Sequence, residues 1–299
     1  AGIIEWLFKT GIEASEAMPI LLFIGIGAMI DFGPLLSQPV LFLFGAAAQF
    51  GIFAAILIAC LMGFDLRDAA SIGIIGAADG PTSILVSQVL GSRYIGPIAV
   101  AAYSYMALVP IIQPPIMKLL TTEKERKIKM EQLRPVSKLE AILFPIIVTI
   151  IVGLISPASV ALVGFLMFGN LIRECGVLQS LSDTAQNELA NLITLLLGIT
   201  ISFSMRADAF VRVDTLMIMG IGLVAFIFDS IGGVLFAKFI NLFIKNKINP
   251  MIGAAGISAF PMSARVVQKM ASEEEKGNII LMHAVGANVS GQIASVIAG

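Results

Sequence analysis

Long apolar stretches alternate with short polar ones along most of this chain. Two of the apolar regions, 70–91 and 250–270, are broken by glycine and proline, which predicts helices that are interrupted inside the membrane. The others predict helices, several of them near the roughly 20 residues that a bilayer-spanning helix needs. These continuous stretches are 18–31, 39–62, 94–117, 141–155, 157–172, 189–204 and 215–244.

The most polar stretch, 118–140, divides the chain into two parts. Its excess of lysine and arginine predicts a cytoplasmic loop. Counting spans onward from it places a second basic loop, 245–247, in the cytoplasm as well. We expect a first membrane repeat over 1–117 and a second over 141–299. Because the chain begins at Ala1 rather than methionine, and ends within an apolar run, we expect the first repeat to be incomplete at its N-terminus.

A short repeated motif relates the two broken regions. The tetrad Ile-Gly-Ala-Ala occurs at 75–78 and again at 252–255, followed by Pro81 and Pro261. If each broken region is a re-entrant hairpin, the repeats are inverted, and if each crosses the membrane, they are parallel. The expected fold is an all-α polytopic membrane protein with inverted structural repeats and two broken or re-entrant helical hairpins.

Composition narrows the class of protein. Hydrophobic residues make up 58% of the chain and charged residues 13%, more apolar material than one soluble core of this length uses. The net charge of −1 offers no basic surface for nucleic acid. A single histidine and two cysteines without ligand spacing argue against a transition-metal site or a histidine-based triad.

Asp79 is the first candidate for chemistry, because it lies at the expected tip of the first broken region, between Gly76 and Ser83. A carboxylate at the centre of a membrane helix costs about 2.5–3.5 kcal/mol, so it is expected to face a polar cavity and to bind a cation or a proton. Backbone carbonyls freed by Gly80 and Pro81 are further oxygen ligands. The alternative is a hairpin turn that lies near the membrane surface.

The second broken region offers Asn249 at its start, Ser258 at its tip and Arg265 beyond. Arg265 is a permanent cation inside an apolar run and has the bidentate geometry that suits a carboxylate. An arginine that snorkels to the membrane interface is its alternative, and a helix cap is the alternative for Asn249.

Polar side chains also occur in the helices that follow each broken region. Tyr103 and Tyr105 precede Gln113 in the first half, and Asn288 precedes Gln292 in the second. A buried phenol needs a polar partner, so each hairpin is expected to be backed by a helix with oxygen ligands. Tyrosines of an interfacial aromatic belt are the alternative.

Four long motifs, at 69–82, 103–117, 169–177 and 247–266, resemble the β subunit of the sodium-pumping biotin-dependent decarboxylases, those of oxaloacetate, methylmalonyl-CoA and glutaconyl-CoA. The resemblance implies a multi-pass subunit of the cell's inner membrane that decarboxylates carboxybiotin, consumes a proton and exports sodium ions. It also implies a carboxyltransferase α subunit, a biotin carrier protein or domain that holds the biotin, a small single-span γ or δ subunit, and a homo-oligomer.

The resemblance further implies roles for individual residues. The implied catalytic residues are Asp79, Tyr105 and Arg265, and carboxybiotin would be bound by Arg265 and Ser258. The implied sodium ligands are Asp79, Tyr105, Asn249, Gly253, Ser258 and Asn288.

Two other functions fit the same pattern. A sodium-coupled carboxylate symporter or sodium/proton antiporter would use the same hairpins and the same Asp79, and it would transport sodium without biotin or partner subunits. A membrane scaffold without a site is disfavoured, because polar residues occur at the tips of both broken regions.

Overall fold

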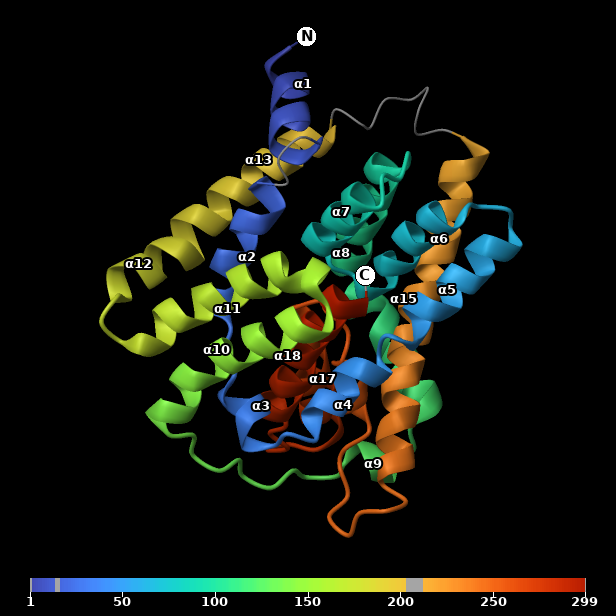
Figure 1. Ribbon diagram of the computed structural model, residues 1–299. Coiled ribbons are helices and arrows are strands. Elements are labelled where there is room, and N and C mark those ends of the chain that lie inside the picture. The colour runs from blue at the N-terminus through green and yellow to red at the C-terminus, as the bar shows by residue number, and fades with distance from the viewer. Residues whose placement is uncertain (1, 14–16, 203–211, 299) are drawn as a thin grey trace.

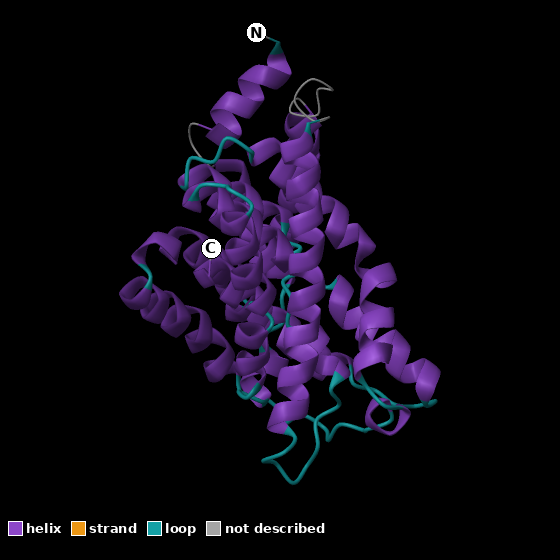
Figure 2. Ribbon diagram, turned by 90° about the vertical axis from the view of Figure 1, so that its right-hand side faces the viewer, coloured by secondary structure: helices purple, strands orange, loops and turns teal. Residues whose placement is uncertain are grey.

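The structure, a computed structural model, describes residues 2–13, 17–202 and 212–298, and these residues form helices and loops without a strand (Figure 2). Its long apolar elements match the stretches expected from the sequence. Within the described ranges, five are long and apolar enough to cross a membrane: Leu41–Leu61, Ile95–Leu120 (α8), Lys138–Ile155 (α10), Val213–Ile240 (α15) and Leu281–Ala298 (α18). The protein is therefore an all-α polytopic membrane protein.

Shorter helices pack around these spans (Figure 1). They include α1 (Ile3–Phe8), α2 (Ala17–Met29), α3 (Gly33–Ser37), α9 (Glu123–Arg126), α11 (Val160–Cys175), α12 (Gln179–Thr184) and α13 (Ala190–Ser202). The Leu41–Leu61 span is itself interrupted, because α4 (Leu41–Ala47) ends and α5 (Phe50–Leu61) begins around Ala48 and Gln49.

The first broken region is a re-entrant hairpin. It consists of α6 (Leu66–Gly73), a short 3₁₀ turn η2 (Ile74–Ala77) and α7 (Gly80–Val89). Its two ends meet, because the carboxylate of Asp68 accepts hydrogen bonds from Ser92 Oγ at 2.7 Å and from Arg93 Nε at 3.0 Å. The chain thus returns to the face from which it came.

The second broken region is also re-entrant, with α16 (Met251–Ala254) before its tip and α17 (Met262–Glu274) after it. Asn249 precedes α16 and Asn278 follows α17, and both side-chain amides donate to the carbonyl oxygens of Arg126 and Ile128. The two stems therefore meet at the polar loop that follows α8.

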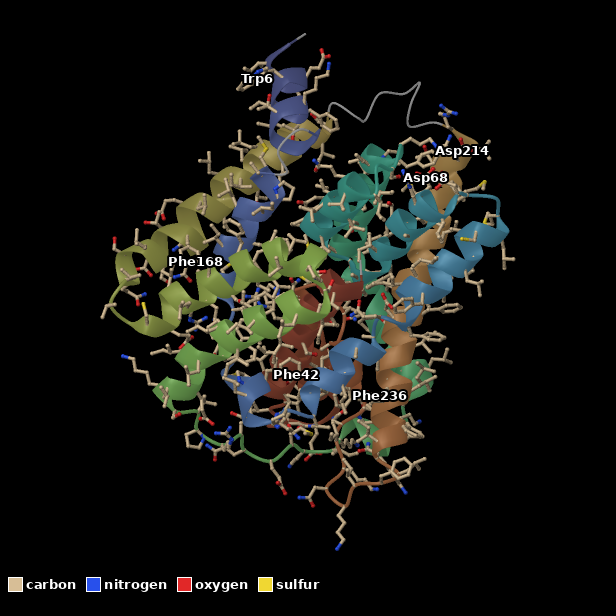
Figure 3. All side chains as sticks on the ribbon, in the orientation of Figure 1. Trp6, Phe42, Asp68, Phe168, Asp214 and Phe236 are labelled. Carbon is tan, nitrogen blue, oxygen red and sulfur yellow. The ribbon has the colours of Figure 1, made fainter. Side chains whose placement is uncertain are left out.

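The hairpins open toward opposite ends of α15. At its N-terminal end, Asp214 accepts a hydrogen bond from Tyr94, which follows the first hairpin, and Figure 3 shows Asp214 near Asp68. At its C-terminal end, Lys238 donates to the carbonyl of Leu120, which precedes the loop that holds the second hairpin. The 28 residues of α15 are about 42 Å long at 1.5 Å per residue, enough to separate two membrane faces.

The two basic loops lie on the same face. Asn246 Nδ2 donates to Glu131 Oε1 at 2.8 Å, which joins the loop after α15 to the loop before α10, both at the bottom of Figure 1. This arrangement agrees with the topology expected from charge. The division into two inverted sequence repeats stays a prediction.

Candidate functional site

The tips of the two hairpins touch in the interior of the protein. The backbone N–H of Ser258, in the second hairpin, donates to the carbonyl oxygen of Ala77, in the first, at 3.1 Å. The first tip turns sharply, because Ala78 adopts a left-handed conformation with φ of 51° that residues with a side chain rarely use. The sequence therefore brings two regions far apart in the chain to one point.

Asp79 lies at this contact and caps α7. Its Oδ2 accepts hydrogen bonds from Thr82 Oγ1 at 2.6 Å and from Ser258 Oγ at 3.3 Å. Only 4% of the residue is exposed, and no lysine or arginine of the described chain forms an ion pair with it. A buried carboxylate with hydroxyl partners but no positive partner is prepared to bind a cation or a proton.

Helix α18 supports the second tip with three polar side chains. Asn288 Nδ2 donates to the carbonyl of Ile257 at 2.6 Å, and Gln292 Nε2 donates to the carbonyl of Ser258. Ser295 Oγ lies 2.7 Å from Ser258 Oγ. These bonds satisfy the backbone carbonyls of an unwound segment, which a membrane interior cannot hydrate.

Several buried oxygens around the tips have no hydrogen-bond partner in the part of the chain that the structure describes. They are Oδ1 of Asn288, Oε1 of Gln292 and the hydroxyl of Tyr103. The ring of Tyr103 packs against Gly80, where an added Cβ would lie 2.4 Å from it, so this hydroxyl belongs to the helix beside Asp79. Unpaired amide and hydroxyl oxygens beside a carboxylate are the donor set that a hard cation such as sodium requires.

Four residues implied by the resemblance make their contacts away from Asp79. Tyr105 donates to the carbonyl of Met219 on α15 at 2.5 Å, and Asn249 lies at the stem of the second hairpin rather than at its tip. Gly253 packs against α15, since a Cβ there would lie 2.0 Å from the carbonyl oxygen of Gly233. Arg265 is exposed in the first turn of α17, and its guanidinium has no ion-pair partner among the described residues. Asp79, Ser258 and Asn288 are thus the implied ligands that the fold brings together.

The two glutamines of the helices behind the hairpins, Gln113 and Gln292, both contact the second hairpin. Gln113 of α8 donates to the carbonyl of Ala254 at 2.8 Å and accepts from Ser263 Oγ at 2.8 Å, so it holds the second hairpin. Gln292 holds that hairpin too. The first hairpin instead has Tyr103 of α8 beside Asp79. Ser295 had no sequence signal, because serine is common in apolar helices.

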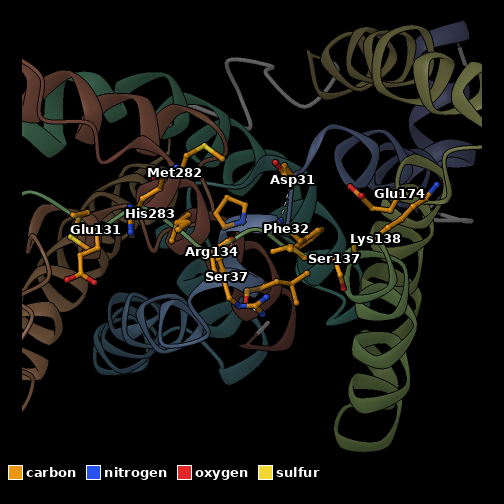
Figure 4. A pocket seen from close by; sticks show the side chains of 18 of the residues that line it. Asp31, Phe32, Ser37, Glu131, Arg134, Ser137, Lys138, Glu174, Met282 and His283 are labelled. Carbon is orange, nitrogen blue, oxygen red and sulfur yellow. Dashed lines mark hydrogen bonds between the residues drawn. The ribbon is translucent and has the colours of Figure 1, made fainter.

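A cavity of about 920 Å³ opens on the face that carries the basic loops. Figure 4 shows Asp31 and Arg134 at its wall, together with Glu174 and Lys138. Arg134 is held at this wall by Glu140 Oε1 at 3.0 Å. Neither Asp79 nor Arg265 lines this cavity, so it is separate from the hairpin tips.

Two opposed re-entrant hairpins that meet at a buried carboxylate define an ion-translocating membrane protein. Over residues 1–299 the sequence matches the protein family described as the Na⁺-transporting oxaloacetate decarboxylase beta subunit, and the chain belongs to this family. It is thus a membrane subunit of a sodium-transporting decarboxylase.

Curated relatives agree over most of their length. The chain is 56% identical over 297 residues to methylmalonyl-CoA decarboxylase subunit beta of Propionigenium modestum, covering 99% of this chain and 75% of that protein. It is 52% identical over 304 residues to the oxaloacetate decarboxylase beta chain of Klebsiella pneumoniae, covering 100% and 70%. It is 51% identical over 283 residues to glutaconyl-CoA decarboxylase subunit beta of Acidaminococcus fermentans, covering 95% and 76%.

Proposed function

We propose that this chain decarboxylates carboxybiotin and uses the released free energy to export sodium ions through the site between its two hairpins. The observation that carries the proposal is the contact of Asp79 with Ser258, because it joins a buried carboxylate of the first hairpin to the tip of the second. A ligand that binds here interacts with both hairpins at once, so its presence can control their movement.

Sodium binds, in this proposal, to the carboxylate of Asp79 and to the oxygens of Ser258, Asn288 and Gln292. These oxygens come from both hairpins and from α18. The hydroxyls of Thr82 and Ser258 already point at Asp79, so the carboxylate is positioned before the ion arrives. Replacing sodium by a proton would neutralise the same carboxylate, which allows one site to serve both ions.

Arg265 is proposed to hold the carboxylate of carboxybiotin. It lies in the first turn of α17, where the helix dipole adds to the attraction for an anion, and its exposed guanidinium is free to form a bidentate pair. Decarboxylation breaks the bond between the biotin nitrogen and the carboxyl carbon, and the nitrogen takes up a proton. Tyr105, Asn249 and Gly253 would then contribute by holding α8 and the second hairpin in place.

Decarboxylation and sodium export must be coupled because export requires free energy. Export of one sodium ion against 100 mV and a tenfold gradient costs about 2.3 plus 1.4 kcal/mol. An open path at the tips would dissipate this free energy. Because a backbone hydrogen bond joins the tips, we propose that the hairpins move together to alternate access.

The partners follow from the family. Its members are named as β subunits, so this chain acts within a complex of several subunits. We propose a carboxyltransferase α subunit, a biotin carrier protein or domain and a small single-span γ or δ subunit as partners, and a homo-oligomer of this chain.

The test is reconstitution of the purified chain in proteoliposomes with free carboxybiotin, with bicarbonate release measured with and without sodium. We expect release that depends on sodium. Arg265→Lys keeps the charge but loses the planar fork, so the apparent affinity for carboxybiotin should fall while the fold survives. Sodium flux without carboxybiotin and without release of bicarbonate would instead identify a symporter or antiporter.

A further inference from the structure

A second buried carboxylate lies outside the site described above. Asp229 is in the middle of α15, has no exposed surface, and points at the interruption between α4 and α5. Its Oδ1 accepts hydrogen bonds from the backbone N–H of Gly51 at 2.5 Å and of Ile52 at 3.2 Å. Both N–H groups belong to the first turn of α5, where backbone donors lack acceptors within the helix. The N–H of Ile52 also donates to the carbonyl of Gln49 at 3.1 Å, whereas Asp229 is the acceptor for Gly51.

The other oxygen of Asp229 faces the first hairpin. Oδ2 has no hydrogen-bond partner among the described residues, although it is fully buried. A Cβ added to Gly76 would lie 2.7 Å from Oδ2 and 2.8 Å from the methyl group of Ala225, so the backbone of η2 packs directly on this oxygen. The sequence places Gly76 three positions before Asp79, so their Cα atoms are at most about 10 Å apart.

The charge of Asp229 is not balanced by the protein. No lysine or arginine of the described chain forms an ion pair with it. A bare carboxylate in a membrane interior is costly, and the two N–H donors satisfy only one of its oxygens. A hard cation would need on the order of six oxygen ligands, whereas the neighbours of Oδ2 at Gly76 are a methyl group and backbone. A proton needs no such shell.

We propose that Asp229 is a proton-binding carboxylate, protonated on Oδ2 in this conformation, whose proton occupancy depends on the position of the first hairpin. While η2 covers Oδ2, the carboxyl group is sealed from water and stays neutral. Movement of Gly76 away from Oδ2 opens the group to water, and the proton can leave. The protonation state of Asp229 would thus depend on the position of the hairpin that carries Asp79.

Other titratable groups on the neighbouring elements are occupied or distant. On α8, Tyr105 donates to Met219 and Lys118 is exposed. On α6, Asp68 is bound by Ser92 and Arg93. Cys60 of α5 is exposed, and the charged groups of α15 that flank Asp229, Asp214 and Lys238, lie near its two ends. None of these described groups has a contact with Asp229, so its protonation is set locally.

The role in transport rests on the proposed function, whereas the protonation of Asp229 does not. The first experiment is therefore infrared spectroscopy of the purified chain in lipid, without biotin or partner subunits. Asp229→Asn keeps an oxygen that accepts from Gly51 and Ile52, so the interrupted span should remain intact. We expect the C=O stretching band of a protonated carboxyl group in the wild type at neutral pH and the loss of the Asp229 component of this band in Asp229→Asn, whereas any component from a protonated Asp79 should remain. Asp214→Asn, a change in the same helix at a side chain that is 40% exposed, should retain the band.

A second measurement separates a proton site from a structural acceptor. If Asp229 releases its proton as pH rises, its negative charge should increase the sodium affinity of Asp79, because two unit charges about 10 Å apart still interact by an amount that corresponds to about tenfold in affinity at an effective dielectric constant of about 20. Asp229→Asn should lack this increase and show a flatter pH dependence of half-saturating sodium. An infrared spectrum and a pH profile unchanged in Asp229→Asn would overturn the proposal and leave Asp229 as a backbone acceptor. If the wild type shows the infrared band of protonated Asp229 but its decarboxylation does not depend on sodium, the proposed function is refuted and the protonation of Asp229 stands.

Discussion

Replacement of Asp79 by asparagine tests the hairpin site most directly, because it removes the charge and keeps the size. The asparagine oxygen can still accept from Thr82 Oγ1, which donates to Asp79 at 2.6 Å. A charge-assisted hydrogen bond is about twice as strong as a neutral one, so the two hydroxyl contacts should weaken by about 1 kcal/mol each. Removing a buried charge offsets part of this loss, and the fold should survive.

The effect on sodium is expected to be much larger. A unit charge and a sodium ion about 4 Å apart attract each other by about 4 kcal/mol at an effective dielectric constant of about 20. Loss of this attraction corresponds to about a thousandfold lower affinity. Asp79→Asn should therefore lose sodium-stimulated decarboxylation and sodium uptake together over the concentrations that saturate the wild type.

The assay measures both activities on the same reconstituted and correctly assembled complex. Asp183→Asn is the matched control, because it also removes one carboxylate but at an exposed position of α12. It should retain both activities. A variant Asp79→Asn with unchanged half-saturating sodium would refute the assignment, and loss of transport alone would mean that Asp79 serves the ion path without controlling the chemistry.

Three further predictions concern the second tip, the packing of its hairpin and the topology. Ser258→Ala removes the hydroxyl that contacts Asp79 at 3.3 Å. One hydrogen bond to a charged group contributes about 1.5 kcal/mol, so the sodium concentration at half-saturation should rise about tenfold. An unchanged concentration would contradict a role of Ser258 in sodium binding. Gly253→Ala places a Cβ 2.0 Å from a backbone oxygen of α15 and should lower stability by about 1–3 kcal/mol in thermal unfolding, whereas Gly220→Ala, with open space around its Cβ, should not. Single cysteines at the exposed Arg67 and Asn246, in a background without the native cysteines, should react with an impermeant reagent from outside and from the cytoplasm respectively; reaction of both from one side would contradict the opposed hairpins.

The sequence predicted the broken helices because glycine and proline remove the hydrogen bonds that hold a helix together. Asp79 could also be found from the sequence, since a carboxylate in an apolar stretch is costly in a membrane and is seldom there without a function. The contact between the tips could not be predicted, because Ala77 and Ser258 are 181 positions apart and their bond is made by the backbone, which carries no sequence signal.

Asp229 shows a different limit. It lies between Phe228 and Ser230 within the apolar stretch 215–244, so a lone carboxylate was visible there. Its significance depends on the interruption of the Leu41–Leu61 span, which leaves the N–H of Gly51 for it to accept. That span is apolar apart from Gln49 and contains Gly45 and Gly51 without proline, so its sequence did not predict a break.

The bond between the tips also has a consequence for how such a pump can diversify. At this point the two hairpins are joined by a main-chain N–H and a main-chain carbonyl, which every residue except proline supplies. The side chains of Ala77 and Ser258 can therefore change without removing the bond between the hairpins. The contact between the hairpins and the choice of ion thus rest on different atoms.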